Sequence, residues 1–407
     1  MQIKTNIVKP DLNQKPIKVF LVCSGLGNIR RGYETEARAC FDTFQQIDSI
    51  DLWLFKGAGK SAKHEIPLWN LPRQKPLNKQ VSKVIAWLTK KDPSSYFTEQ
   101  LSFCISLLPY IYWEKPDVIY FSDESIGDLL WHWRKLTKTN YKLLFKNGGP
   151  TSNWHNIVRW DYVQQIAPVH FQSALNIGLS PDRQTLLPPG FDLPSRLITL
   201  EAHERDALRR KLNLPEKRPI VLSVAAIDQS RKRIDYIIRE LAALPEPRPY
   251  FLCLGQQTEE TPEITSLAKK LLGEENFQFR TVPHSEVSGY YKVSNVFVLA
   301  SLIEGFGLVF VEALSHGLPC IAHNYEVASF VLGQEGYLGD FTQSGSLTRL
   351  IAQVLVEPDH LSKRFNRYQT AYKNFSWEVL IPSYIELFYR CKESLPSYQK
   401  SIFETSN

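Results

Sequence analysis

The sequence predicts an α/β protein built from two doubly wound domains that face a cleft. Short apolar runs, suited to buried strands, alternate with segments of helical periodicity along most of the chain. The alternation stops at a proline-rich segment, 186–192, and then restarts at residue 219. A chain of 407 residues is long enough for two hydrophobic cores of ordinary size. Strands that alternate with helices form parallel sheets covered by helices on both faces.

The composition excludes several classes of protein. Hydrophobic residues make up 43% and charged residues 22% of the chain, as in globular proteins. A net charge of +6 on this length indicates no nucleic-acid partner. The six cysteines form no Cys-x-x-Cys pair, and the N-terminus is polar, without the apolar core of a signal peptide. The longest apolar stretch, 101–113, is too short to span a bilayer. We therefore expect a cytoplasmic protein.

The first domain, expected at residues 1–192, begins with a buried strand, a glycine loop and an amphipathic helix. The strand is Ile17–Cys23, the loop contains Gly25 and Gly27, and apolar side chains then recur at helical spacing up to Phe44. Further strands are expected at Asp51–Phe55, Asp117–Phe121, Tyr141–Phe145 and Pro168–Phe171.

The second domain is expected at residues 193–376. A charged helix over Glu201–Lys211 leads into a strand over Pro219–Ala226, a helix over Ile234–Leu244 and a strand over Tyr250–Leu254. The tail, 377–407, contains an amphipathic helix up to Cys391. In doubly wound sheets, ligands bind beyond the carboxyl ends of the strands, so functional residues are sought on the loops there.

The most informative passage in the chain is a strand, a glycine-rich loop and a helix over residues 296–319. The apolar run Val296–Ala300 reads as a buried strand, and a helix starts at Leu308 and stops at Gly317. Glu304 lies on the loop, and Glu312 lies one turn inside the helix, on the face of Leu308. Glycines at a helix N-terminus expose backbone N–H groups, and the helix dipole attracts an anion. A phosphate there would lie between two carboxylates, as a sugar-nucleotide site requires.

This passage resembles the nucleotide-sugar motif of glycosyltransferase family 4, the retaining transferases of GT-B fold. The resemblance rests on Ser301–Leu308, Val311–Leu314 and His316–Pro319. It implies two Rossmann-like domains and a C-terminal helix that crosses back to the first domain. It also implies catalytic roles for Glu304 at the donor sugar and for Lys232 at the donor phosphates. It further implies that Glu312 binds the ribose and that Val282, two residues before His284, lies near the base. The remaining donor-binding residues that it implies are Gly305, Phe306, Gly307 and Leu308.

The second domain's first strand leads into a basic loop, Arg231-Lys232-Arg233. Cations above a sheet can neutralise a diphosphate leaving group, although a solvated basic loop has the same composition. The family usually carries an arginine at the position of Ala226, where this chain departs from the pattern. Arg231 is the candidate to reach the same phosphates.

Two loops of the first domain resemble parts of the family's site. The Gly25–Gly27 loop is not a dinucleotide fingerprint, because that pattern requires a third glycine at position 30, where this chain has Arg30. The loop resembles instead the family's glycine loop, which approaches the donor phosphates. A tight turn without a ligand is the alternative.

Asn147 stands near the point where many family members have a histidine that contacts the donor sugar, so it is the third catalytic candidate. An amide cannot act as a base, but a retaining reaction can pass the acceptor proton to the leaving phosphate. An ordinary loop with left-handed glycines is the alternative here.

Residues 56–91 are strongly basic. They contain nine Lys or Arg residues against Glu65 alone, with Trp69 and Trp87 interleaved and Trp53 just ahead. This pattern suits peripheral contact with anionic lipid or a lipid-linked acceptor, at the inner face of the membrane. The alternative is an ordinary helix that packs its apolar stripe, Leu77 to Leu88, on the domain.

No metal site is predicted, because the histidines are isolated from other ligands; only His316, Cys320 and His323 are close in sequence, and the break at 317–319 separates them. Gly57–Ser61 imitates the end of a phosphate-binding P-loop, but Leu54 stands where the pattern requires glycine.

The sequence therefore predicts a retaining glycosyltransferase of the hexosyltransferase type. It would move a sugar from a nucleoside diphosphate to a glycan or lipid-linked hydroxyl acceptor. The family resemblance implies a role in polysaccharide or glycoconjugate synthesis. No cofactor and no metal would be needed, because Lys232 and helix amides would stabilise the diphosphate. An inactive GT-B-like binding module and a GT-B sugar-nucleotide epimerase are the alternatives.

Overall fold

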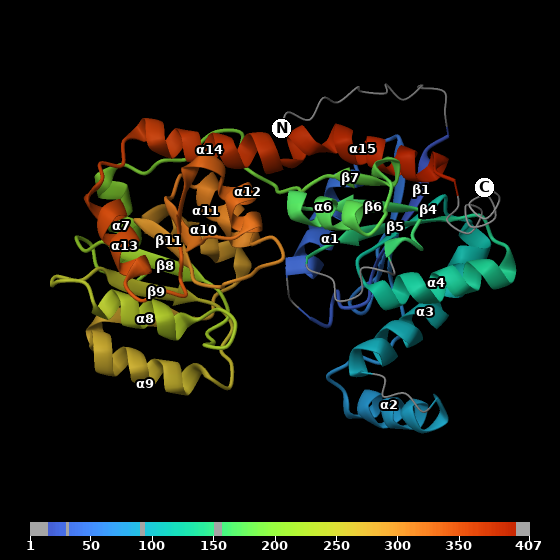
Figure 1. Ribbon diagram of the computed structural model, residues 1–407, viewed down its shortest axis with the longest axis horizontal. Helices are drawn as coiled ribbons and strands as arrows, with labels where there is room; N and C mark the ends of the chain where they lie inside the picture. The colour runs from blue at the N-terminus through green and yellow to red at the C-terminus, as the bar shows by residue number, and fades with distance from the viewer. Residues whose placement is uncertain (1–14, 30–31, 90–93, 150–156, 396–407) are drawn as a thin grey trace. The chain divides into compact units, whose positions relative to one another are not determined.

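The chain divides into two compact units, which are described separately. The computed structural model describes residues 15–29, 32–89, 94–149 and 157–395. One unit comprises Met1–Asp192 together with Trp377–Asn407, and the other comprises Leu193–Ser376 (Figure 1). Among the described residues, no helix has both the length and the apolar character that a membrane span requires.

The first unit is built on a seven-stranded parallel sheet in the order β3-β2-β1-β4-β5-β6-β7. Its strands are β1 (Ile17–Cys23), β2 (Ile50–Lys56), β3 (Glu65–Pro67), β4 (Val118–Phe121), β5 (Lys142–Asn147), β6 (Tyr162–Gln165) and β7 (Gln184–Leu186). The strand order reverses between β1 and β4, which are hydrogen-bonded neighbours with Val19 opposite Val118. The loops after these two strands are therefore this sheet's ligand-binding position.

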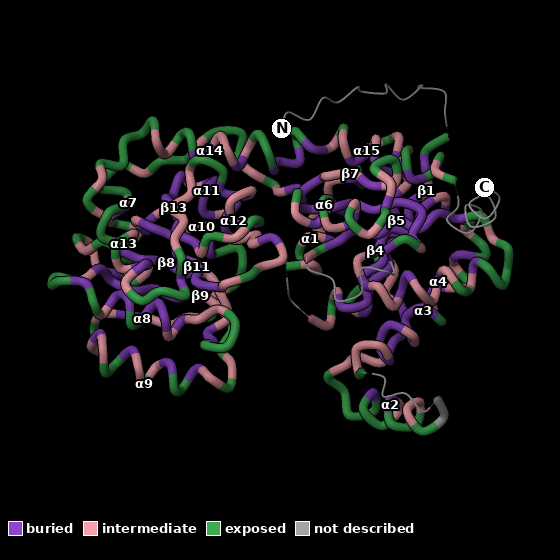
Figure 2. Tube along the Cα trace, in the orientation of Figure 1, coloured by how far each residue is buried: buried purple, intermediate pink, exposed green. Residues whose placement is uncertain are grey.

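Helices cover both faces of this sheet, and Figure 2 shows its strands as mostly buried. The helices of the unit are α1 (Gly32–Phe44), α2 (Pro76–Thr89), α3 (Ser95–Glu114), α4 (Glu124–Thr137), α6 (Pro168–Asn176) and α15 (Trp377–Glu393). Side chains of α1 and α15 form one core with β1 and β2, and side chains of α3 and α4 form a second core on β1, β4 and β5. A 3₁₀ turn, Pro181–Arg183, precedes β7.

The prediction of a strand at Pro168–Phe171 is wrong. These residues open helix α6, with Pro168 in its first turn, and the strand lies just upstream as β6. A short apolar run does not by itself distinguish a strand from a helix, and proline suits the first turn of a helix because no backbone donor is needed there. The polar side chains of Gln164 and Gln165 conceal β6 in the sequence, although both are fully buried.

Helix α15 belongs structurally to the first unit. Its apolar stripe, including Trp377, Leu387 and Phe388, joins the core around Phe44. The Trp377 backbone N–H donates to the Phe191 carbonyl over 2.9 Å, and the rings of Phe44 and Trp377 are 5.9 Å apart, edge to face. A tail helix of the chain thus completes the core of the N-terminal part.

The second unit contains a six-stranded parallel sheet in the order β10-β9-β8-β11-β12-β13. Its strands are β8 (Ile220–Val224), β9 (Tyr250–Leu254), β10 (Phe277–Arg280), β11 (Val296–Leu299), β12 (Cys320–His323) and β13 (Gly336–Gly339). Its helices are α7 (Ala202–Lys211), α8 (Ile234–Ala242), α9 (Thr261–Leu272), α10 (His284–Val293), α11 (Leu308–Ser315), α12 (Glu326–Leu332), α13 (Ser346–Val356) and α14 (Leu361–Phe375). Two 3₁₀ turns, Glu274–Asn276 and Gly333–Glu335, precede β10 and β13.

The two parallel sheets confirm the predicted pair of doubly wound α/β domains. In the second unit the strand order reverses between β8 and β11. The predicted basic loop follows β8, and the predicted Glu304 loop follows β11. Because the carboxyl ends of parallel strands meet at one edge of the sheet, the order β8–β11 places these two loops side by side.

Candidate active site

A hollow of about 390 Å³ lies where the strand order of the second unit reverses. Its walls come from two loops, 230–233 after β8 and 302–305 after β11. Small-molecule sites in proteins commonly enclose about 300–1,000 Å³. The lining residues are Ser230, Arg231, Lys232, Arg233, Leu302, Ile303, Glu304 and Gly305.

The N-terminus of α11 follows the Glu304 loop directly. Gly307 caps the helix with a φ of +77°, and a Cβ there would lie 2.6 Å from the Phe310 ring, so only glycine fits. The Phe310 N–H donates to the Gly307 carbonyl over 2.8 Å. The amides before it, including that of Leu308, have no carbonyl one turn earlier within the helix. They carry the positive end of the helix dipole and suit an anion.

Phe306 fixes the position of this loop. Its side chain is buried, and its ring meets the Phe375 ring of α14 edge to face at 5.6 Å. The Phe306 side chain is therefore occupied with packing, so only its backbone is available to a ligand. Gly305, by contrast, lines the hollow itself.

Lys232 and Glu304 form an ion pair between the lysine Nζ and a carboxylate oxygen. Both side chains are only 17% exposed, so the pair is shielded from water on most sides while still bordering the hollow. The two residues are 72 positions apart in the sequence. The structure thus brings together the predicted phosphate-binding cation and the predicted sugar-contacting carboxylate.

The basic loop is held in place by two carboxylates. Asp228, which is buried, accepts the backbone N–H groups of Lys232 and, over 3.0 Å, of Arg231. Glu260 accepts those of Gln229 (2.7 Å) and Ser230 (3.1 Å). Such bonds fix the backbone before any ligand arrives, so little loop entropy is lost on binding.

The three cations of the basic loop have different surroundings. Arg231 is exposed and lines the hollow beside Lys232. Arg233 also lines it, but its guanidinium donates to the Phe341 carbonyl over 3.0 Å and lies over the Tyr236 ring. Arg231 is therefore the cation with more freedom to reach a bound anion.

Glu312 is held on α11 by two side chains of α10. Tyr291 donates its hydroxyl to one carboxylate oxygen over 2.9 Å, and the other oxygen lies 3.2 Å from His284 Nε2. The hydrogen bond to Glu312 raises the pKa of His284 above its usual 6.5. Burial, followed by the Glu312 charge, raises the pKa of Tyr291 well above its usual value, so this phenol stays a donor.

His316 supports the same cluster from behind. It stacks on Tyr291 at 5.1 Å, and its Nδ1 lies 2.7 Å from the Glu312 carbonyl and its Nε2 2.8 Å from the Ser288 hydroxyl. Burial lowers the pKa of His316. Over the described parts of the chain, no group of three or more His, Cys, Asp or Glu side chains is placed to hold a metal ion.

Val282 lies half-buried on the loop between β10 and α10, two residues before His284. It does not line the hollow. Its link to the Glu312 cluster is through the chain, because His284 begins α10 two residues later.

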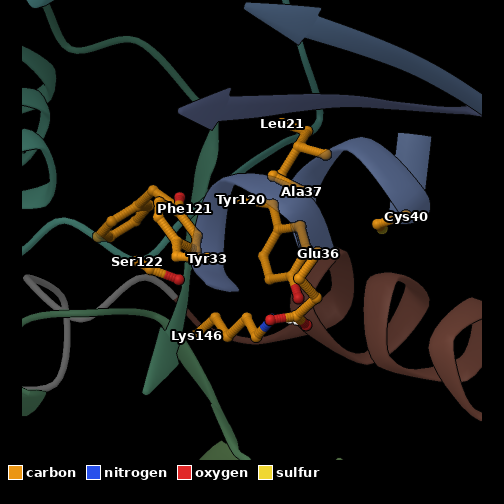
Figure 3. A pocket seen from close by; sticks show the side chains of 9 residues that line it. All are labelled: Leu21, Tyr33, Glu36, Ala37, Cys40, Tyr120, Phe121, Ser122 and Lys146. Carbon is orange, nitrogen blue, oxygen red and sulfur yellow. Dashed lines mark ion pairs between the residues drawn. The ribbon is translucent and has the colours of Figure 1, made fainter. Parts of the chain in front are cut away.

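In the first unit, Asn147 is buried at the end of β5. Its amide donates to Gln165 Oε1 over 2.8 Å, and the Gln165 amide donates in turn to Gln184 over 2.9 Å. The neighbouring Lys146 forms an ion pair with Glu36 at a void of about 10 Å³ (Figure 3). Burial lowers the pKa of Lys146 to about 7. The void is no larger than a water molecule requires, so it is not a substrate site.

The glycines after β1 make close contacts with protein. A Cβ on Gly25 would lie 2.3 Å from a Glu34 carboxylate oxygen, and one on Gly27, whose φ is +92°, would lie 2.2 Å from the Ala58 carbonyl. The Ala58 N–H donates to the Leu26 carbonyl over 3.1 Å. Contacts within the unit thus account for both glycines without a ligand. A Cβ on Gly57, in the sequence that imitates a P-loop, would likewise lie 1.9 Å from the Ser24 carbonyl oxygen.

Two tyrosines near the site escaped the sequence analysis. Tyr291 is described above, and Tyr325 opens α12, after β12. Burial, and then the Glu304 charge, raise the pKa of Tyr325, and its hydroxyl has no hydrogen-bond partner among the described residues. Only the order of the strands, which places β12 beside β11, could have indicated Tyr325.

Comparison with known proteins agrees with this geometry. Residues 204–372 match the family described as Glycosyl transferases group 1. The chain is 23% identical over 227 residues to a D-inositol 3-phosphate glycosyltransferase of Xylanimonas cellulosilytica, covering 54% of each protein. It is 29% identical over 167 residues to the lipopolysaccharide glucosyltransferase WaaG of Escherichia coli K12, covering 39% of this chain and 41% of WaaG. These matches span about half the length of the curated relatives or less.

Similar solved structures extend over nearly the whole chain. Sucrose-phosphate synthase from Thermosynechococcus elongatus is 19% identical with a TM-score of 0.73, over 92% of this chain and 98% of that one. Anabaena Alr3699/HepE in complex with UDP is 16% identical with a TM-score of 0.71, over 92% of this chain and 99% of that one. At these identities the similarity establishes the fold, which is GT-B.

The two units are therefore the Rossmann-like domains of a GT-B protein. Within them, residues 204–372 match the model of the group 1 glycosyltransferases. The sequence-based recognition of a glycosyltransferase of the family 4 kind is confirmed. The stereochemistry of the reaction and the roles of individual residues stay predictions.

Proposed function

We propose that this protein transfers a sugar from a nucleoside diphosphate to a hydroxyl acceptor, with retention at the anomeric carbon. One observation carries the proposal: Lys232 and Glu304 meet at a hollow where the strand order reverses, beside the N-terminus of α11. A cation, helix amides and a carboxylate are the groups that a diphosphate joined to a sugar requires.

The ion pair suggests how the donor is received. The donor diphosphate attracts the Lys232 ammonium away from Glu304, and Arg231 and the amides of Phe306 to Leu308 bind the remaining phosphate oxygens. Glu304 is then free to contact the sugar and to stabilise the positive charge that develops at its anomeric carbon. The bond from that carbon to the diphosphate oxygen breaks, and the bond to the acceptor oxygen forms on the same face. The acceptor proton passes to the leaving phosphate.

Glu312 is proposed to hold the ribose hydroxyls. Tyr291 and His284 fix its carboxylate on the exposed side of α11, one turn from the proposed phosphate position. Val282 and the start of α10 then lie on the side proposed for the base. No metal or cofactor enters this scheme, because Lys232, Arg231 and the helix amides neutralise the diphosphate.

The class of donor and acceptor is proposed from the relatives. Solved structures similar to this chain include Anabaena Alr3699/HepE with UDP and with UDP-glucose, which supports a nucleoside-diphosphate sugar. WaaG, named for lipopolysaccharide, and the Erwinia amylovora protein AmsD, named for amylovoran synthesis, support a glycan or lipid-linked acceptor. We assign the acceptor to the first unit, residues 1–192, where the strand order reverses between β1 and β4.

The assignment of Asn147 and of the Gly25–Gly27 loop to the donor site remains a prediction. The Asn147 amide is already bonded to Gln165, and the glycines are explained by protein contacts. Glu304, Lys232 and the start of α11 therefore carry the proposal without them.

A screen of sugar nucleotides with mixed glycan and lipid acceptors tests this function, with mass spectrometry of the released nucleotide and of the glycosylated product. We expect one donor to release its diphosphate and glycosylate an acceptor, in the presence of EDTA as in its absence. Conversion of a UDP-sugar without any acceptor would instead favour the epimerase, and binding of no nucleotide would favour the inactive module.

A further inference from the structure

Helix α2 exposes three of its apolar side chains and buries two polar ones, while Val81 and Ile85 are half-buried. Leu77, Val84 and Trp87 are 55%, 56% and 79% exposed, whereas Asn78 and Ser82 are buried. A helix that packed its apolar stripe on the domain would show the opposite pattern. The alternative expectation, an ordinary helix that packs its apolar stripe on the domain, therefore does not hold for Leu77, Val84 and Trp87. Leu88, Lys90 and Lys91 lie outside the part of the chain whose side chains are described.

The buried polar side chains attach α2 to α3. Asn78 donates its amide to the carbonyls of Leu71 (2.7 Å) and Ser95 (3.0 Å), and the hydroxyls of Ser82 and Thr98 are 2.7 Å apart. Arg73, just ahead of α2, donates to the Glu99 carboxylate of α3 through both its backbone and its guanidinium. Because these polar contacts fix the helix, its outward apolar face is a stable feature of the fold. In Figure 1, α3 lies between α2 and the sheet of this unit.

The outward face of α2 combines an apolar strip with lysines. Leu77 and Val84 are seven positions apart and Trp87 follows three positions later, so the three lie along one side of the helix. Lys83 lies one turn before Trp87 and Lys79 one turn before Lys83, so both lysines lie on the Trp87 side of this strip, and both are exposed. The sequence from Ile66 to Thr89 contains no Asp or Glu that could neutralise them.

Further exposed apolar side chains lie just before α2 and on α3. Trp69 is 66% exposed, and its carbonyl accepts the Ser106 hydroxyl over 2.8 Å, which places it beside α3. On α3, Ile105, Tyr112 and Trp113 are also exposed, and their spacing of seven and eight positions places them on one side of that helix. Exposed apolar surface of this extent marks an interaction site, and tryptophan is enriched where proteins meet the bilayer interface.

Two other basic residues of the segment, and the tryptophan just ahead of it, are not available to this surface. Lys56 is buried in an ion pair with Glu65, and Arg73 is paired with Glu99. Trp53 stacks on His64 at 4.6 Å. The available surface is therefore narrower than residues 56–91; we call the set Trp69, Leu77, Lys79, Lys83, Val84 and Trp87 the α2 face.

We infer that the α2 face docks on a bilayer that contains anionic lipid. Its apolar strip would enter the interface between headgroups and acyl chains, while Lys79 and Lys83 contact lipid phosphates. Charge complementarity favours this occupant over a second copy of the chain, because two α2 faces would bring lysines against lysines. The inference goes beyond the proposed function, since it requires no residue of the donor site.

Co-sedimentation with vesicles tests the inference on the full chain. We expect binding to phosphatidylcholine vesicles that contain phosphatidylglycerol, little binding to phosphatidylcholine alone, and release by salt. Removal of each lysine charge should weaken binding about fivefold, so the double variant Lys79→Gln/Lys83→Gln should lose most of it. Trp87→Ser should also weaken binding, with retained salt dependence.

Matched variants control for loss of charge or of apolar surface in general. Leu136, 77% exposed on α4, and Lys270, exposed on α9, lie outside the α2 face. Leu136→Ser and Lys270→Gln should bind vesicles like the wild type. All variants should bind nucleotide equally, so a failure of docking is distinguishable from a failure of the proposed function.

Three outcomes would overturn the inference. The first is no sedimentation of the wild type with anionic vesicles at low salt. The second is equal binding to neutral vesicles, or binding that Trp87→Ser leaves unchanged. The third is lipid-free self-association, measured by light scattering, that Trp87→Ser abolishes; this would assign the face to a second copy of the chain.

Discussion

The Lys232–Glu304 ion pair gives the candidate site its chemistry. Each side chain satisfies the charge of the other in the absence of a ligand, although both border an open hollow. A buried or shielded charge that loses its partner is costly, so the pair opens readily only when another charged group replaces it. In the proposed reaction, the donor diphosphate is such a group for Lys232, and the developing positive charge on the sugar is such a group for Glu304.

Removing either member should therefore abolish most of the transfer. We expect Glu304→Gln and Lys232→Ala each to lower kcat by about 10²–10³, the loss typical of a deleted transition-state contact. Steady-state kinetics measures the loss, and circular dichroism should show intact folding. Lys270→Ala, at an exposed position on α9, should leave kcat unchanged. Wild-type turnover in either site variant would refute its role.

The contact between Glu312 and His284 predicts a measurable titration. In the wild type the pKa of His284 should exceed 6.5, and Glu312→Gln should return it toward that value, as followed by NMR of the imidazole. Because the folded-state pKa is raised, the stabilisation is present below pH 6.5 and is lost as pH rises through the raised pKa. The side chain is 73% exposed, so the effect on stability should be small. An unchanged pKa in the variant would show that the contact does not form.

The contacts between side chains of the site were less predictable from the sequence than the identity of the site residues. The Glu304 loop could be read from the sequence, because a glycine loop between a strand and a helix has a local signature. The pairing of Glu304 with Lys232 could not, because it depends on β8 lying beside β11. The hydrogen bond from Asn147, the last residue of β5, to Gln165 was hidden for the same reason, because it depends on the neighbouring strand β6.

Among the elements, strands with long apolar runs were predictable and polar or short ones were not. β1, β8 and β11 are apolar almost throughout, as buried parallel strands require. β6 carries two buried glutamines whose polarity is satisfied by neighbouring side chains and carbonyls, so its sequence resembles a loop. The edge strand β13, with glycine at both ends, also lacks a local signal.

Helix α15 supplies a stability test at the scale of one element. Leu387 is 1% exposed within the core of the first unit, whereas Leu395, shortly after the helix, is 62% exposed. Leu387→Ala should destabilise the unit by about 2–5 kcal/mol, through lost burial and the cavity left behind. Leu395→Ala should cost less than about 0.5 kcal/mol. Urea denaturation compares the two, and equal midpoints would contradict the packing of α15 on this unit.

At the scale of the whole molecule, the two proposed binding surfaces lie on different units. The second unit carries the hollow with its cations and carboxylates, and the first carries the α2 face. If both inferences hold, the protein binds a soluble donor on one unit and approaches a membrane through the other. That division suits an enzyme whose acceptor is attached to lipid.

The most direct test of the central claim is isothermal titration calorimetry with UDP, GDP and ADP. The claim is that the hollow beside α11 binds a nucleoside diphosphate. The wild type should bind at least one of the three, and Lys232→Ala should weaken that binding at least about tenfold, as expected for loss of a charge-assisted hydrogen bond. Absence of binding by all three nucleotides, or unchanged affinity in Lys232→Ala, would contradict the account.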